Sequence, residues 1–291
     1  MTSRSPEVHL NLSVPDLAAA AAALPAAGVG LMRAEFLALG VGTHPMALLA
    51  RGGEAAFLEV FRGGLEVVAR AFHPRPVTYR TLDLKSNEYR GLVGGADWEP
   101  MEANPMIGLR GAARYVARPD ELALELRAVA MAVDGGLDNV RLMIPFVRTL
   151  DELAAVKALV AESGLPDRGV PLWMMAEVPS NALMARRFAA EVDGVSIGSN
   201  DLTQLILGAD RDSPELAARY GVTEEPVVDA IALVVEGAHA AGVPASICGD
   251  AASRDPELVA ALVRMGIDAL SVVPSAFEDT VRAVEGAKAR A

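Results

Sequence analysis

The sequence predicts an α/β protein built as a single (β/α)8 barrel, also called a TIM barrel. Short apolar segments recur along the 291 residues with longer amphipathic stretches between them, which is typical of strands that alternate with helices. Several of the apolar segments lack strict alternation, and this indicates strands buried on both faces, as in parallel sheets. Barrels of this kind occupy roughly 250 residues, so one domain over residues 1–291 fits the length.

Eight segments are predicted strands. In chain order they are GVGLM (28–32), VTYRTL (77–82), MIGLR (106–110), VRLMIPF (140–146), LWMMAE (172–177), GVSIGS (194–199), ASICG (245–249) and ALSVV (269–273). A further segment, VHLNL (8–12), precedes the first of them and is not counted among the eight. An open dinucleotide-binding sheet is the competing architecture, but GVGLMRAEF holds only a lone GxG, and no GxGxxG opens a helix.

The stretches between the strands predict helices at 54–72, 119–134, 150–163, 180–191, 224–241 and 255–265. Thr149 is followed three residues later by Glu152, which is the spacing of a capping box. Asp255 followed by Pro256 is a second helix start signal. Residues 83–105 interrupt the alternation because they are polar, rich in Gly and Pro and too long for an ordinary connection. We predict a functional loop there.

The composition excludes several classes of protein. Hydrophobic residues make up 52% and charged residues 22%, which supports a large core and excludes a disordered chain. With 38 acidic and 26 basic side chains the formal charge is −12, which disfavours a nucleic acid or a membrane surface as partner. Cys248 is the single cysteine, so no internal disulfide can form, and no apolar run is long enough to span a membrane. We therefore expect a cytoplasmic protein.

Arginines stand at the ends of predicted strands, where barrel enzymes place their chemistry. The first three predicted strands end at Arg33, Arg80 and Arg110. A lone arginine at a strand end is usually a surface salt-bridge partner, but three of them in this position predict a cationic site. Guanidinium groups match phosphate and carboxylate with paired hydrogen bonds, so the expected ligand is a small anion that carries both groups.

Carboxylates and a thiol follow the later strands. Glu177 follows the fifth, Asn200 and Asp201 follow the sixth, and Cys248 ends the seventh. Glu177 and Asp201 either neutralise the arginines or form a pair of hard oxygen ligands for Mg²⁺. Cys248 is either a small buried hydrophobe or a group that transfers a proton. The four histidines are scattered along the sequence, and we assign none of them a catalytic role.

Seven segments together resemble the C-terminal domain of the phosphoenolpyruvate-utilising enzymes. They are GVGLMRAEFL (28–37), YRTLDLKSNEY (79–89), GGADWEPMEANPMIGLRGAARY (94–115), RLMIPFVRTLDE (141–152), MMAEVPSNAL (174–183), DGVSIGSNDLTQLILGADRDS (193–213) and ICGDAASRDPE (247–257). Within that family the loop beginning DLKSNEY is most similar to that of the phosphoenolpyruvate synthases. Pyruvate phosphate dikinase and enzyme I of the sugar phosphotransferase system are more distant in their resemblance. The resemblance covers nearly the whole chain and implies a barrel that binds phosphoenolpyruvate or pyruvate with Mg²⁺.

The resemblance also implies a role for each candidate residue. Phosphate and carboxylate binding is implied for four arginines and one amide: Arg33, Arg80, Arg110, Arg211 and Asn200. Metal binding is implied for Glu177 and Asp201, and Cys248 is implied as the acid/base that exchanges a proton with the methyl or methylene carbon. Arg33 and Arg80 are counted with Cys248 among the catalytic residues.

Members of the family that the sequence resembles contain several domains. A phosphohistidine domain carries the phosphoryl group, and in the synthase and the dikinase an ATP-binding domain loads it. Residues 1–291 leave no room for either, and no histidine lies in a recognisable phosphohistidine motif. The resemblance therefore implies a subunit with a separate phosphohistidine or ATP-binding partner, an excised domain of a longer protein, or a repurposed barrel. It also implies a homodimer, since family members commonly dimerise through this domain.

The leading hypothesis is a phosphotransferase that interconverts pyruvate and phosphoenolpyruvate with Mg²⁺. It would perform the enolisation and phosphoryl-transfer half of a synthase-like reaction and would need the partner described above. Two alternatives stay open. The same barrel could use a pyruvate enolate for carbon–carbon bond cleavage or formation, as a lyase or an aldolase, or it could be a non-catalytic phosphoenolpyruvate-binding regulatory subunit.

Overall fold

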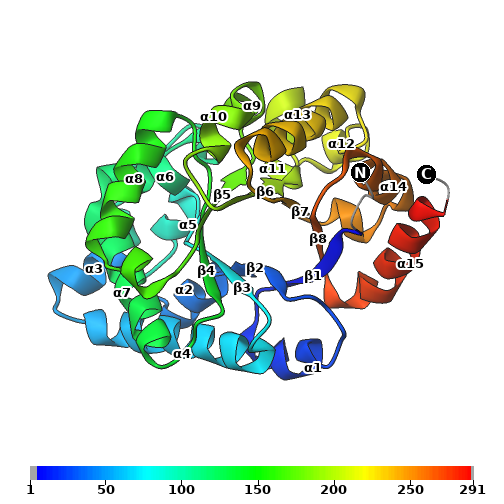
Figure 1. Ribbon diagram of the computed structural model, residues 1–291. Coiled ribbons are helices and arrows are strands. Elements are labelled where there is room, and N and C mark those ends of the chain that lie inside the picture. The colour runs from blue at the N-terminus through cyan, green and yellow to red at the C-terminus, as the bar shows by residue number, and fades with distance from the viewer. Residues whose placement is uncertain (1–4, 290–291) are drawn as a thin grey trace. The chain divides into compact units, whose positions relative to one another are not determined.

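The structure is a computed structural model that describes residues 5–289. Within these residues eight parallel strands follow one another in chain order around a closed barrel, with helices between them, so the predicted (β/α)8 barrel is confirmed (Figure 1). The strands are β1 (Glu7–Leu12), β2 (Val29–Arg33), β3 (Val77–Arg80), β4 (Val140–Ile144), β5 (Leu172–Ala176), β6 (Gly194–Gly198), β7 (Ala245–Cys248) and β8 (Ala269–Val272).

Helices occupy most of the chain between the strands. The α-helices are α1 (Ala18–Ala22), α2 (Glu35–Val41), α3 (Pro45–Ala50), α4 (Glu54–Phe72), α5 (Ser86–Arg90), α6 (Gly111–Ala117), α7 (Pro119–Asp134), α8 (Leu150–Glu162), α9 (Pro179–Leu183), α10 (Ala185–Ala189), α11 (Ser199–Leu207), α12 (Pro214–Ala217), α13 (Glu225–Ala241), α14 (Pro256–Met265) and α15 (Phe277–Lys288). Short 3-10 helices are η1 (Pro15–Leu17), η2 (Gly95–Asp97), η3 (Pro105–Ile107), η4 (Pro166–Arg168), η5 (Ala251–Ser253) and η6 (Pro274–Ala276).

One predicted strand is wrong. Residues 106–110 form the end of η3 and the approach to α6, and Arg110 is the residue that precedes the first turn of α6, not the end of a strand. Pro105 opens this segment, and it supplies no backbone N–H for a strand ladder. Ile107 is 57% exposed, so the apolar letters of this segment do not belong to the barrel core.

The segment that we did not count, VHLNL, is the first barrel strand. It lies within β1, which pairs with β8 in parallel register, with His9 opposite Ser271. Polar residues inside this strand obscured it in the sequence. His9 is buried, and the side-chain amide of Asn11 donates a hydrogen bond to the Ser271 carbonyl oxygen at 3.1 Å.

The predicted helices agree with the structure apart from one break. The ranges 54–72 and 119–134 coincide with α4 and α7, and those at 150, 224 and 255 agree with α8, α13 and α14 to within one residue at either end. The predicted helix 180–191 is two helices, α9 and α10, because Met184 leaves the helical conformation with φ −124° and ψ 27°. The predicted loop 83–105 contains α5, η2 and the first residue of η3, and Val93 forms an isolated parallel bridge with Thr43.

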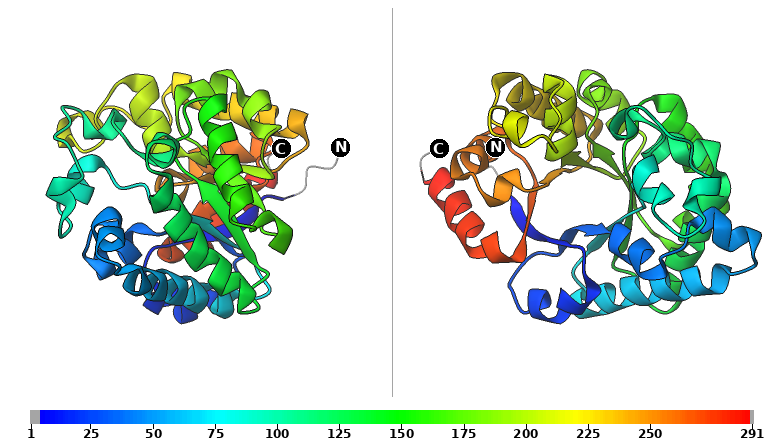
Figure 2. Two further views of the ribbon diagram at one scale, coloured as in Figure 1. Left: turned by 90° about the vertical axis from the view of Figure 1, so that its left-hand side faces the viewer. Right: turned by 180° about the vertical axis from the view of Figure 1, so that it is seen from behind.

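The chain forms two compact units. The central unit comprises residues 13–19 and 32–171, and the terminal unit comprises the described residues of 1–12, 20–31 and 172–291. In the central unit α4 packs along α7, and its buried face contributes Phe57, Phe61 and Phe72 to the core (Figure 1). In the terminal unit α13 packs along α9 and α10, as the view from behind shows (Figure 2).

No helix in the described part of the chain is both long and apolar enough to cross a membrane. The longest, α4, carries charged side chains along one face, where Arg62 pairs with both Glu59 and Glu66. Its opposite face is apolar and buried, as expected for an amphipathic helix that covers a sheet.

The start of α14 provides a first test of the fold. The Asp255 carboxylate accepts hydrogen bonds from the backbone N–H groups of Glu257 at 2.9 Å and Leu258 at 3.2 Å. Removing a cap of this kind costs about 1 kcal/mol of stability. We expect Asp255→Ala to lower the free energy of unfolding in urea by that amount. Glu236→Ala, an exposed change within α13, is the control, and an equal effect in both variants would contradict the capping role.

Candidate functional site

Arg80 and Arg110, two of the three predicted arginines, are brought together by carboxylates of the central unit. Arg110 Nε and Nη2 donate to Asp83 Oδ1 at 3.0 Å and Oδ2 at 2.5 Å, and both side chains are buried. Arg80, at the end of β3, donates from Nη2 to Glu35 Oε1 at 2.7 Å, and its Nη1 lies 3.9 Å from Asp83 Oδ2. The backbone N–H of Asp83 also donates to Glu35 Oε1 at 2.9 Å. The two guanidinium groups are therefore held in fixed orientations by a shared pair of acids.

The ring of Phe146 supports Arg110 from the end of β4. The Arg110 guanidinium carbon lies 4.2 Å from the ring centroid, and that of Arg148 lies 4.6 Å from the same centroid. Arg148 also donates from Nη2 to the carbonyl oxygen of Gly108 at 2.6 Å. Phe146 has φ 50°, which is unusual for a residue with a large side chain. Backbone strain of this kind is concentrated at functional sites.

Arg33 differs from the other two arginines. It ends β2, is half-buried, and its side chain has no hydrogen bond or ion pair with any residue in 5–289. A positive charge without a counter-charge among the described residues is available to an anionic ligand. We call Arg33, Arg80 and Arg110 the cationic group of the central unit.

Three functional candidates in the central unit were missed in the sequence: Glu35, Asp83 and Arg148. The sequence shows which residues end strands, but it does not show which acid each arginine contacts. Asp83 lies in the predicted functional loop, and Glu35 follows Arg33 by two residues. The sequence therefore places both acids near predicted site residues, but it does not show which arginine each acid contacts. Arg148 follows the fourth predicted strand in IPFVR, and the strand-end argument applied to that strand would have found it.

Glu125 is a buried acid in the same unit, on α7. Its carboxylate accepts a hydrogen bond from the Tyr79 hydroxyl at 2.6 Å and from the backbone N–H of Leu82 at 3.1 and 3.2 Å. Burial raises the pKa of Glu125 to about 8, although both hydrogen bonds favour the ionised form. The carboxyl is therefore mostly protonated at neutral pH, which is unusual for glutamate.

The terminal unit holds the remaining predicted residues around the end of β6. Glu177 follows β5 and is buried, and a Cβ added at Gly198 would lie 2.5 Å from Glu177 Oε2. Only glycine at position 198 leaves room for this carboxylate. Asp201 is buried in the first turn of α11, directly after β6, and Arg211 Nη1 lies 3.3 Å from Asp201 Oδ2.

Cys248 ends β7 beside the same strand end. It pairs with Gly198 in the parallel register, is buried, and its Sγ lies 3.5 Å from the carbonyl oxygen of Ile197. Ser199 donates a hydrogen bond to the Cys248 carbonyl oxygen at 2.8 Å. Gly249 follows with φ 108°, and a side chain there would collide with Ser199 Oγ, so the close approach of the two strand ends requires glycine.

Asn200 lies at this strand end too, and its side chain has no hydrogen bond with another residue of 5–289. We call Glu177, Asn200, Asp201, Arg211 and Cys248 the thiol–carboxylate group of the terminal unit. Glu177 and Asp201 offer carboxylate oxygens, which are the ligands that Mg²⁺ prefers. The donor set therefore fits a magnesium ion, with Arg211 as a competing partner of Asp201.

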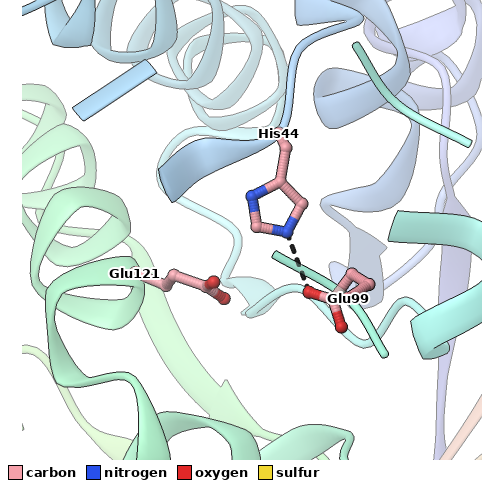
Figure 3. A group of neighbouring side chains, drawn as sticks. All are labelled: His44, Glu99 and Glu121. Atoms are coloured by element: carbon pink, nitrogen blue, oxygen red, sulfur yellow. Dashed lines mark hydrogen bonds and ion pairs between the residues drawn. The ribbon is translucent and has the colours of Figure 1, made fainter. Parts of the chain in front are cut away.

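A second candidate metal group lies in the central unit and does not fit a cation. His44, Glu99 and Glu121 are buried, with ligand atoms within 4.8 Å of one another, and His44 Nε2 lies 2.9 Å from Glu99 Oε1 (Figure 3). Arg114 Nη2 lies 2.6 Å from Glu99 Oε1, and Arg114 Nε lies 2.6 Å from Glu121 Oε2. Arg118 also pairs with Glu99. Two guanidinium groups already neutralise these acids, so the group is a buried ion-pair network.

The pKa of Glu99 supports this interpretation. Burial opposes its ionisation, but hydrogen bonds from His44, Arg114 and Arg118 and the charge of Arg114 lower the pKa to about 2. The acid is ionised and paired at neutral pH. The network attaches the 83–105 loop to α3, α6 and α7, since Glu99 and Trp98 belong to that loop.

Gly198 tests the space around Glu177. We expect Gly198→Ala to force the carboxylate aside and to lower the free energy of unfolding by roughly 1–3 kcal/mol, as measured in urea. Gly63 is the matched control, because it lies in α4 with no atom within 4 Å of an added Cβ. Gly63→Ala should be neutral or stabilising by up to about 1 kcal/mol. Equal destabilisation by both changes would contradict the close packing of Glu177.

The raised pKa of Glu125 predicts a pH dependence of stability. A carboxyl with a folded-state pKa near 8 and a reference pKa of 4.5 contributes stability that is complete below pH 4.5 and is lost as the pH rises to 8. Gln at this position stays neutral throughout. As the pH rises from 5 to 8, we expect the free energy of unfolding of Glu125→Gln to increase relative to that of the wild type by on the order of 3–5 kcal/mol. Parallel profiles for the two proteins would contradict the raised pKa.

The fold and the residues at its strand ends define a class. A (β/α)8 barrel with charged and reactive residues at the ends of its strands is typical of an enzyme domain. The chain matches the model of the PEP-utilising enzyme, PEP-binding domain, over residues 2–288. It belongs to this family of phosphoenolpyruvate-utilising enzymes, so the resemblance noted in the sequence is confirmed.

Sequence comparison with curated proteins supports the same family. A protein of Staphylothermus marinus named probable phosphoenolpyruvate synthase is 48% identical over 285 residues, which are 96% of this chain and 34% of the relative. The phosphoenolpyruvate synthase of Pyrococcus furiosus is 42% identical over 273 residues, which are 93% of this chain and 33% of the relative. The chain thus spans about a third of the length of these curated relatives.

Solved structures of low sequence identity share the fold. The Haloferax volcanii malate synthase pyruvate/acetyl-CoA ternary complex matches with a TM-score of 0.58 at 13% identity, over 98% of this chain and 70% of that one. An HpcH/HpaI aldolase/citrate lyase family protein from Burkholderia cenocepacia matches with a TM-score of 0.52 at 16% identity, over 99% of this chain and 95% of that one. At these identities the likeness concerns the fold alone.

Proposed function

We propose that this chain binds phosphoenolpyruvate or pyruvate and performs the enolisation and phosphoryl-transfer half of their interconversion, as part of a synthase-like phosphotransferase. The observation that carries the proposal is the presence, in one chain of the PEP-binding family, of both the cationic group and the thiol–carboxylate group. Relatives named phosphoenolpyruvate synthase support the substrate class.

The cationic group is assigned to the anionic parts of the substrate. Arg33, Arg80 and Arg110 orient the phosphate and the carboxylate, because guanidinium groups bind both with paired hydrogen bonds. Arg33, which has no partner in residues 5–289, meets the ligand with its full charge. Arg80 and Arg110 are held in advance by Glu35 and Asp83, so little side-chain entropy is lost on binding.

The thiol–carboxylate group is assigned to the reacting carbon and to the metal. Cys248 gives its thiol proton to the terminal carbon of the enolate to form the methyl group of pyruvate, and in the reverse direction its thiolate takes a proton from that methyl group and exchanges it with solvent. Glu177 and Asp201 are the residues that would hold Mg²⁺. When bound, Mg²⁺ stabilises negative charge on the enolate and phosphoryl oxygens. Asn200, whose amide has no partner in residues 5–289, and Arg211 are assigned to the substrate phosphate.

The remaining partners are part of the same proposal. The phosphoryl group is exchanged with a phosphohistidine carried by another domain or protein, since the relatives are about three times as long as this chain. We also propose a homodimer in the cytoplasm, where the single cysteine stays reduced.

Proton exchange of pyruvate tests the proposal. Proton NMR in D2O with Mg²⁺, with and without inorganic phosphate, should show loss of the pyruvate methyl signal. We expect Cys248→Ala to slow this loss on the order of 10²-fold or more, because the acid/base group is removed. Phosphoenolpyruvate binding, measured by calorimetry, should change little. Equal exchange rates in the variant would remove Cys248 from the mechanism.

Two other results would favour the alternatives. Tight phosphoenolpyruvate binding by the wild type, with no exchange of the pyruvate methyl protons either with or without inorganic phosphate, would favour a regulatory subunit. Consumption of pyruvate together with an added aldehyde or acyl thioester, without phosphate, would favour the carbon–carbon lyase or aldolase. A surface variant such as Glu236→Ala controls for loss of folded protein in each assay.

A further inference from the structure

The strongest unassigned feature of the central unit is the buried carboxyl of Glu125, and the inference drawn from it rests on the proposed function. Glu125 lies on α7, outside the cationic group, and only 1% of its surface is exposed. Its contacts are directed to the segment of chain that leaves β3. No step of the proposed reaction uses it.

The segment that Glu125 contacts carries Arg80 of the cationic group and Asp83, the acid that pairs with Arg110. Arg80 ends β3, Leu82 follows two residues later, and Asp83 comes next. Asp83 holds Arg110 through two hydrogen bonds. Any shift of the backbone at Leu82 therefore moves both Arg80 and the acid that orients Arg110.

The backbone of Leu82 is satisfied by side chains and not by the sheet. The last hydrogen bond from this strand to β4 is made by the N–H of Thr81, to the carbonyl oxygen of Met143 at 3.1 Å. The N–H of Leu82 then donates to both oxygens of Glu125, and its carbonyl oxygen accepts from the Tyr115 hydroxyl. Leu82 is buried, so without these two side chains its polar groups would lack partners.

We propose that Glu125 and Tyr115 are positioning residues that clamp the Leu82 backbone and so hold Arg80 and Asp83 in the orientation that binds the anionic substrate. Glu125 and Tyr115 act on Arg80 and Asp83 through the backbone of Leu82, and they themselves touch no substrate. A third contact, from the Tyr79 hydroxyl to Glu125 at 2.6 Å, fixes the carboxyl itself to β3.

The charged and titratable groups around Glu125 favour a neutral clamp. They are Tyr79 and Arg80 on β3, Glu35 on α2, Tyr89 on α5 and Tyr115 on α6. Burial and the charge of Glu35 raise the pKa of Glu125, and Arg80 lowers it. A neutral carboxyl can be replaced by a neutral amide of the same shape, which gives a conservative variant for the test.

The experiment measures phosphoenolpyruvate affinity of the full chain by calorimetry at pH 7 with Mg²⁺. We expect Glu125→Ala to weaken binding about 10-fold or more, since a misplacement of about 1 Å costs this much or more at a site. Glu125→Gln should bind within about 3-fold of the wild type, because a factor of 3 is under 1 kcal/mol. Val129→Ala is the matched control, because it truncates a buried side chain of the same helix that has no polar group to bond the Leu82 backbone, and it should bind as the wild type does.

The outcomes separate the clamp from general stability and from the proposed function. Wild-type affinity in Glu125→Ala, or an equal loss in Val129→Ala, overturns the clamp. If the wild type binds no phosphoenolpyruvate, the proposed function fails, and the clamp is then decided by backbone hydrogen exchange of residues 79–85. Faster exchange there in Glu125→Ala than in Glu125→Gln and Val129→Ala supports the clamp, and unchanged exchange overturns it.

Discussion

The ion pair between Asp83 and Arg110 is the interaction on which the central unit's site depends. Both side chains are buried, and a buried charge without its partner costs several kcal/mol, so neither residue can move alone. Because Asp83 is fixed in this way, its backbone N–H reaches Glu35, and Glu35 reaches Arg80. One charge pair thereby sets the direction of two guanidinium groups that are 30 residues apart in sequence.

The fold was largely predictable because buried parallel strands leave continuous apolar runs. The hydrophobic pattern gave wrong strand predictions where polar residues are buried or apolar residues are exposed. His9 and Asn11 are polar but belong to the buried first strand, whereas Ile107 is apolar and exposed, in a segment opened by Pro105. Hydrophobic periodicity reports which residues prefer burial, and it does not report polar groups that are satisfied inside a barrel.

The sequence predicted most of the residues of the candidate site, but it predicted only part of their positions and contacts. Residues such as Cys248 stand at strand ends in the sequence and in the structure, because strand ends are local features. Arg110 was predicted for the wrong reason, since it precedes a helix and its position depends on Asp83 and Phe146. Partners such as Glu35 and Glu125 come from other elements, and no local pattern in the sequence indicates which backbone or guanidinium group they meet.

The left-handed conformation of Phe146 has a consequence for protein engineering. Glycine or asparagine adopts a positive φ with less strain than phenylalanine, so either replacement would relieve the backbone at this position. At this position such a replacement would also remove the aromatic ring that both Arg110 and Arg148 contact. Local backbone preference and side-chain contacts therefore favour different residues here, and a sequence optimised only for stability would lose the surface against which Arg110 is held.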